Sequence, residues 1–294
     1  MRITSGMVMD TALRNIESNM DRVSELEAQL TSGSRIQKPS DDPIGAARSL
    51  SFQESLGATG QYLSNIDQAK SWLDMTDSTL AEVTNTVHRA RELAIQAANG
   101  TNSAEDRAQI LAEIEQLQQH TLSLAQAKHA GSFIFAGTKS DQPGYVQANP
   151  STTAGAYQGN TNDVVREISP GVTMAVTSNA TTTFDPVFDA LNQLASGLST
   201  NTQGTIEGSI GAFDTALDAV LTSRAQVGAK ANRLESLNSR MSSVQVNLSE
   251  LLSKEKDVDF AQAITNFSMA QNTYQASLKA GAQALQPSLL DYLK

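Results

Sequence analysis

An apolar repeat in steps of three and four residues, present toward both ends of the chain, most constrains how this sequence folds. Between Val227 and Leu251 the repeat continues over several heptads, which is typical of a coiled coil. Further stripes precede Ser32 and follow Asp259. A stripe on one helix cannot bury itself, and isolated helices are marginal in water. The N- and C-terminal helices are therefore expected to bury each other.

The residues of these stripes are the candidate coiled-coil and assembly residues. We expect pairing within one copy over Val227–Leu251, and contacts between copies nearer Ile3–Met20 and Phe260–Leu285. Burial of each Leu, Ile or Met is worth roughly 1.5–3 kcal/mol, so either use is stabilising. The candidates are Leu13, Ile16, Met20, Val23, Val227, Leu234, Leu237, Met241, Val244, Leu248, Leu251, Phe260, Ile264, Phe267, Tyr274, Leu278 and Leu285.

Capping and breaking residues divide the helical regions. A Gly follows the first helix at Gly33, Asp-Pro pairs at Asp42 and Asp185 indicate helix starts, and a capping-box pattern begins at Ser103. The expected helices cover residues 3–30, 43–98, 103–129, 186–198, 204–255 and 260–285.

The middle of the chain has the patterns of β-strands instead of a helical repeat. Phe133–Ala136 has the pattern of a strand, and Val164–Ile168 and Val172–Thr177 flank a Ser-Pro-Gly turn as in a β-hairpin. The predicted fold is mainly α with a small β-rich insert. Its N- and C-terminal regions form an elongated antiparallel helical bundle or coiled coil. The predicted domains are an N-terminal helical half at 1–130, a β-rich lobe at 131–183 and a C-terminal helical half at 184–294.

Composition argues against several classes of function. The net charge of −10 argues against binding to nucleic acid or to an anionic membrane. There is no Cys, and none of the three His residues lie three or four positions apart, so no metal site is expected. No nucleophile with a base is recognised, and Asp41, Asp42, Asp257 and Asp259 are interpreted as helix caps or as contacts between subunits. The chain is therefore expected to be no enzyme and to need no cofactor.

Three separated segments resemble signatures of the bacterial flagellin superfamily. They are Leu30–Ala47, Glu92–Thr101 near the end of the second long helix, and Asp257–Thr265. The resemblance covers about 1–140 and 185–294. Pro39 with Pro43, the segment Ser132–Thr138 and the ending Ser288–Leu293 resemble the hook-associated branch of this superfamily.

The resemblance implies a flagellin-like structural component of the bacterial flagellum, an adaptor at the hook–filament junction that joins another hook-associated protein to flagellin. The implied partners are copies of itself in a ring, those two neighbours, and an export chaperone at the C-terminal region. The implied location is extracellular, after export through the flagellar secretion channel without a cleaved signal peptide. The sequence has no stretch of signal-peptide or membrane-span pattern.

Other functions stay open at this point. Filament flagellin itself is the first alternative, and copy number per filament separates it from an adaptor. An adhesin or partner-binding module that acts through the lobe at 131–183 is the second. An enzyme is a distant third.

Overall fold

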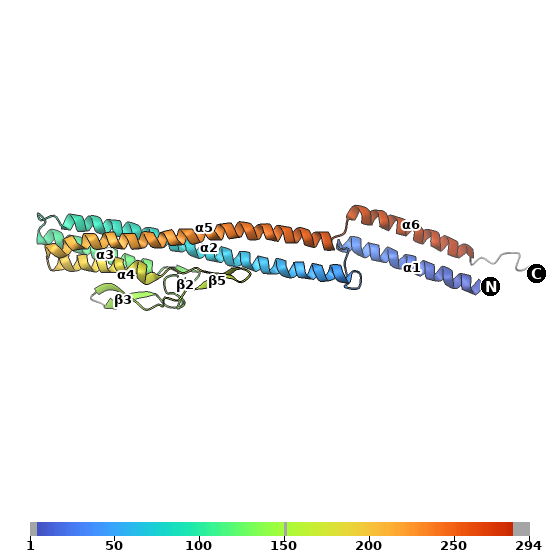
Figure 1. Ribbon diagram of the computed structural model, residues 1–294, viewed down its shortest axis with the longest axis horizontal. Coiled ribbons are helices and arrows are strands. Elements are labelled where there is room, and N and C mark those ends of the chain that lie inside the picture. Colours follow the sequence, from blue (N-terminus) through green and yellow to red (C-terminus); the bar gives the residue numbers. More distant parts are fainter. Residues whose placement is uncertain (1–4, 150–151, 285–294) are drawn as a thin grey trace, which may run out of the picture. The chain divides into compact units, whose positions relative to one another are not determined.

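Six helices and six short strands make up the regular structure of residues 5–149 and 152–284, which the computed structural model describes (Figure 1). The predicted mainly α fold with a small β insert is confirmed. The helices are α1 (Ser5–Ser32), α2 (Pro43–Ala97), α3 (Ala104–Ala125), α4 (Ala180–Ser199), α5 (Gln203–Lys256) and α6 (Phe260–Ala284).

The chain divides into two compact units. The end unit combines both ends of the chain, up to Ala58 and from Gln245 onward, and the middle unit comprises Thr59–Val244. Helices α2 and α5 each contribute residues to both units.

Two helix starts agree with the predictions from capping patterns. Before α2, the Asp42 carboxylate accepts a hydrogen bond from the backbone N–H of Gly45 at 2.9 Å. Before α3, the Ser103 hydroxyl accepts from the backbone of Asp106 at 3.1 Å, and the Asp106 carboxylate accepts from the backbone of Ser103 at 3.0 Å. Both arrangements satisfy N–H groups that have no partner inside the helix.

The predicted start of α4 at Asp185 and Pro186 is wrong. The helix begins at Ala180, and Asn179 is its N-cap. The Asn179 side chain accepts a hydrogen bond from the backbone N–H of Thr181 at 3.2 Å. Asn179 was not among the caps predicted from the sequence.

A buried aromatic cluster explains the earlier start of α4. The carboxylate of Asp185 accepts a hydrogen bond from the Tyr145 hydroxyl at 2.7 Å, and burial raises the pKa of Tyr145. Phe184 and Phe188 are buried, with ring centroids 5.6 and 5.3 Å from that of Tyr145. Pro186 removes one helical hydrogen-bond donor. Burial of Phe184 before it and of Phe188 after it nevertheless favours helix on both sides of Pro186.

The strands form three separate antiparallel hairpins in the middle unit. The hairpin at residues 165–175 is as predicted, whereas the one at residues 145–157 was not expected, because that segment has few long apolar side chains. Helix α3 ends at Ala125 rather than His129, and the strand expected at Phe133–Ala136 continues no further than Phe133. The pairs are β1 (Lys128–His129) with β2 (Ser132–Phe133), β3 (Tyr145–Asn149) with β4 (Thr152–Tyr157), and β5 (Val165–Ser169) with β6 (Val172–Ala175).

Helices α2 and α5 run antiparallel in the middle unit and supply the long seam of its core. Buried side chains from both helices, such as Leu73, Leu80, Val220, Val227 and Leu234, belong to one apolar cluster with residues of α3, α4 and the hairpins. Ion pairs at the margins of the seam fix the same antiparallel register. They are Lys70 with Glu235, Asp77 with Arg224 at 3.0 Å, and Arg91 with Asp214 at 2.7 Å.

Truncation of a seam residue tests this core. Leu234→Ala removes a fully buried side chain and should lower the free energy of unfolding of the middle unit by about 2–5 kcal/mol. The matched control is Leu221→Ala, on the same helix but exposed, which should cost about 0.5 kcal/mol or less. Urea unfolding followed by fluorescence of Trp72, the single and buried Trp, measures both. Equal losses in the two variants would contradict the assignment of the seam.

Candidate assembly site

Helices α1 and α6 lie side by side in the end unit and bring the two ends of the chain together (Figure 1). They run antiparallel, because Gly33 at the end of α1 lies beside Phe260 at the start of α6, while Ile16 lies beside Gly281. Each helix has its less exposed residues in steps of four and three, as in a coiled-coil seam. These are Ala12, Ile16, Asn19, Val23, Leu26 and Leu30 on α1, where Gln29 beside Leu30 is also half-buried, and Ala263, Phe267, Ala270, Tyr274, Ser277 and Gly281 on α6.

Small residues occupy much of this seam. A Cβ atom at Gly281 would lie 2.9 Å from Cδ1 of Ile16, so the absence of a side chain there allows the helices to approach closely. Across the described part of the end unit, the apolar residues that are buried are Ile36, Ala263 and Ala270. The buried Leu, Phe and Val side chains of the described chain belong instead to the middle unit. The pair of α1 and α6 therefore buries little apolar surface by itself.

Several large apolar side chains of this pair are left exposed. Leu13 and Met20 each follow a seam residue of α1 directly, and Ile264 and Leu278 follow seam residues of α6. Their exposed fractions are 47%, 58%, 54% and 42%, and Phe260 is 53% exposed. We call Leu13, Met20, Phe260, Ile264 and Leu278 the outer stripe. A group of exposed apolar side chains like this one marks an interaction surface.

The predicted site residues fall into three groups. Ile16, Val23, Phe267 and Tyr274 are half-buried in the seam of α1 and α6, whereas Leu13, Met20, Phe260, Ile264 and Leu278 form the outer stripe. On α5, Val227, Leu234 and Met241 are buried, Leu237, Val244 and Leu248 are half-buried, and Leu251 is exposed. Leu285 lies outside the described residues.

Reasoning from the sequence missed the small and polar members of the seam. Ala12, Asn19, Ala263 and Ala270 were not candidates, because the stripes were traced through large apolar side chains. An uninterrupted spacing of four and three residues was the signal that could have revealed them, once Ala and Asn are accepted as seam residues.

Backbone hydrogen bonds join the segment after α1 to the segment after α5. The N–H of Arg35 donates to the carbonyl of Lys256 at 2.7 Å, and the N–H of Val258 donates to the carbonyl of Gly33 at 3.0 Å. Gly33 has φ of +68°, a left-handed conformation that favours glycine. The side chain of Arg35 also donates to the carbonyl of Glu255 at 2.9 Å. The segment after α1 and the segment after α5 are therefore held to each other by backbone hydrogen bonds.

Two carboxylates order the segment between α1 and α2. The Asp41 carboxylate accepts from the backbone N–H groups of Lys38 at 2.8 Å and Gln37 at 3.1 Å, and these bonds lower its pKa. The pKa of Asp42 is lowered by the hydrogen bond from the Gly45 backbone and by Arg35 at 3.3 Å. Both carboxylates thus have structural roles as hydrogen-bond acceptors.

No group of His, Asp and Glu in residues 5–149 and 152–284 has an arrangement that could hold a metal ion. None of the helices in this part of the chain is both long and apolar enough to span a membrane. The feature that stands out in the end unit is therefore the exposed outer stripe on the paired helices α1 and α6.

Comparisons with known proteins identify the family. The model of the bacterial flagellin N-terminal helical region matches residues 3–140, and the model of the C-terminal helical region matches residues 210–293. A flagellar filament 30.7 kDa core protein of Treponema maltophilum is 30% identical, over 97% of this chain and 96% of that protein. The chain belongs to the bacterial flagellin family, which is a family of structural flagellar proteins.

Within this family the chain is similar to hook-associated proteins. Flagellar hook-associated protein 3 of Escherichia coli is 27% identical, over 95% of this chain and 96% of that protein. The crystal structure of Bacillus cereus FlgL superposes with a TM-score of 0.61 at 26% identity, over 69% of this chain and 99% of that one.

The two backbone bonds to Asp41 give a prediction for pH dependence. Because the pKa of Asp41 in the folded chain lies below its ordinary value of 3.8, the bonds should persist as the pH falls to that value and be lost only below it. Asp41→Ala should make hydrogen exchange of the Gln37 and Lys38 amides several-fold faster at neutral pH. NMR exchange measurements test both, with Asp10→Ala as the control. Unchanged exchange in Asp41→Ala would show that the carboxylate does not order this segment.

Proposed function

We propose that this chain is a structural component of the bacterial flagellum that acts as the adaptor at the hook–filament junction. It joins another hook-associated protein to flagellin. The observation that carries the proposal is similarity to hook-associated protein 3 along almost the whole of both chains. The exposed outer stripe supports it, because a subunit that completes its apolar contacts with neighbours needs such a surface.

The outer stripe supplies the driving force for assembly. Burial of a Leu, Ile, Phe or Met side chain contributes roughly 1.5–3 kcal/mol. Several such side chains in each copy, repeated around a ring, stabilise a closed assembly strongly even though one pair of α1 and α6 is weak. The proposed neighbours are other copies of this chain in a ring, another hook-associated protein on one side and flagellin on the other.

The same stripe needs protection before assembly. We propose that the chain leaves the cell through the flagellar secretion channel without a cleaved signal peptide. An export chaperone that covers the C-terminal region, including the exposed side chains Phe260, Ile264 and Leu278, would prevent premature association.

The parts of the chain have separate roles in this proposal. Residues 1–130 and 184–294 are the two halves of the helical core, and residues 131–183 form a lobe. An adhesin or partner-binding role of this lobe remains a more distant alternative. Filament flagellin is the nearer alternative, and the identity of 30% with a filament core protein favours it.

Labelling of intact flagella separates the adaptor from filament flagellin. A gold-labelled antibody against this chain should mark a single narrow zone at the base of each filament, as seen by electron microscopy. Label along the whole filament would contradict the adaptor proposal and support the filament alternative. A strain that lacks the chain is the control for antibody specificity.

Substitution of the outer stripe tests the surface that drives assembly. The double variant Leu13→Ser and Met20→Ser should keep the helix content of the free chain, because both side chains are exposed. It should reduce attachment of filaments to hooks by about tenfold or more, since two buried side chains are lost from every contact. Filament counts and circular dichroism are the measurements.

The matched control changes two polar residues that are exposed on the same helix, Asn15→Ser and Ser18→Asn. This control should attach filaments normally. If the double variant of Leu13 and Met20 also attaches them normally, the outer stripe is not the assembly surface.

A further inference from the structure

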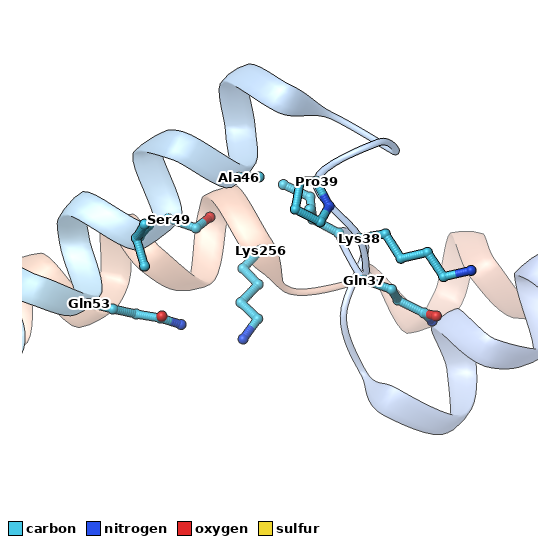
Figure 2. Close-up of a pocket in the computed structure, with 9 residues that line it drawn as sticks. Gln37, Lys38, Pro39, Ala46, Ser49, Gln53 and Lys256 are labelled. Atoms are coloured by element: carbon cyan, nitrogen blue, oxygen red, sulfur yellow. The ribbon is translucent and has the colours of Figure 1, made fainter.

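A small cavity lies beside the first turns of α2 in the end unit (Figure 2). Its volume is about 180 Å³, and its walls come from the segment after α1, from α2 and from Lys256 at the end of α5. Pockets for drug-sized ligands usually measure about 300–1,000 Å³. The cavity therefore has room for one side chain or a small ion, but not for a molecule of cofactor size.

A buried hydroxyl without a partner lines this cavity. Ser49 is 6% exposed, and its Oγ makes no hydrogen bond to any residue that the structure describes. A helical Ser usually donates to the carbonyl four residues earlier, and a buried polar atom that is left unpaired destabilises the fold. The Ser49 hydroxyl is thus an unpaired donor inside the cavity wall, and its oxygen has almost no surface open to the cavity.

The charged residues of the cavity wall are all basic. None of the residues that line it is acidic, although the chain contains 31 Asp and Glu against 21 Lys and Arg. Lys256 makes no ion pair with a residue of the described ranges 5–149 and 152–284. In Figure 2 the amide end of Gln53 and the ammonium group of Lys256 point toward one another, whereas the ammonium group of Lys38 points away. Amide and ammonium donors suit a carboxylate, which only accepts hydrogen bonds.

The backbone of Lys256 is held in place before any ligand binds. Its carbonyl accepts from the backbone N–H of Arg35 at 2.7 Å and from the hydroxyl of Ser34 at 3.3 Å. The backbone of the following residue, Asp257, pairs with that of Ser34 in an isolated antiparallel β-bridge. A site whose parts are already held in place loses less entropy when it binds.

We propose that this cavity binds the carboxylate of an Asp or Glu side chain from a second copy of this chain. The inference rests on the proposed function, in which copies lie next to each other in a ring. Each copy carries a net charge of −10 and so offers many carboxylates to a basic cavity. Leu50, which lines the cavity, and Ile44 nearby on α2 are each 67% exposed. A neighbouring protein surface would cover these apolar side chains, whereas a free ion would leave them in water.

Carbodiimide cross-linking of isolated flagella tests the proposal, because it joins a Lys amine directly to a carboxylate in contact with it. The expected product is a dimer of this chain in which mass spectrometry finds Lys256 linked to an Asp or Glu. Copies with and without ¹⁵N, expressed together, show whether the two linked peptides come from different copies. In Lys256→Arg the charge stays but the amine is lost, so filaments should attach normally and this cross-link should vanish.

Two further variants measure the contribution of the cavity to assembly. Lys256→Gln should reduce filament attachment by about tenfold, because the carboxylate of the neighbour is then buried without its cation. Gln53→Ala should also reduce attachment, because it removes the amide donor of the cavity, but should not lower the melting temperature of the free chain, since Gln53 is exposed. The matched control is Lys38→Gln, at the same cavity but with its ammonium group turned away, which should leave attachment unchanged.

The outcomes separate this inference from the proposed function. Flagella that contain the chain but give no cross-link from Lys256, or one within a single copy, overturn the inference and leave the adaptor function intact. A cross-link from Lys256 to a different protein also overturns it. Flagella that lack the chain altogether contradict the proposed function itself.

Discussion

The pairing of α1 with α6 is the interaction on which the arrangement of the chain ends depends, because it is formed by the two ends of the chain. Its seam contains Ala263, Ala270 and Gly281, so the helices approach closely but bury little apolar surface. The larger side chains of the outer stripe stay in contact with water. A pair built in this way leaves large apolar side chains for another surface to cover, as the proposed assembly requires.

The middle unit follows the opposite principle. Its core buries long apolar side chains from α2 and α5 together with an aromatic cluster around Tyr145 and Phe184. Since burial of each large side chain contributes roughly 1.5–3 kcal/mol, this unit has the means to fold by itself. The chain thus has one unit with a large apolar core and a second unit whose apolar side chains, in the proposed assembly, are covered by neighbouring subunits.

The segments that follow α1 and α5 are joined to each other by hydrogen bonds. Hydrogen bonds from Arg35 to Lys256 and from Val258 to Gly33 join these two segments. Asp41 accepts from backbone N–H groups of the segment after α1, and Asp42 accepts from a backbone N–H group in the first turn of α2. These contacts use backbone groups and short polar side chains rather than apolar burial. They therefore hold the chain ends together even where the apolar seam is thin, and they also shape the cavity beside Ser49.

The sequence alone determined the helices, their period, and the caps at Asp42 and Ser103, because periodicity and capping depend on neighbours within one turn. Only the tertiary structure decided which apolar residues face inward. Ala12 and Leu13 lie one position apart, so both fit a helical stripe, and close packing against α6 places the smaller one in the seam. Burial of Tyr145 against Asp185 likewise decided that α4 begins at Ala180, because a contact between distant segments overrode the local cap signal.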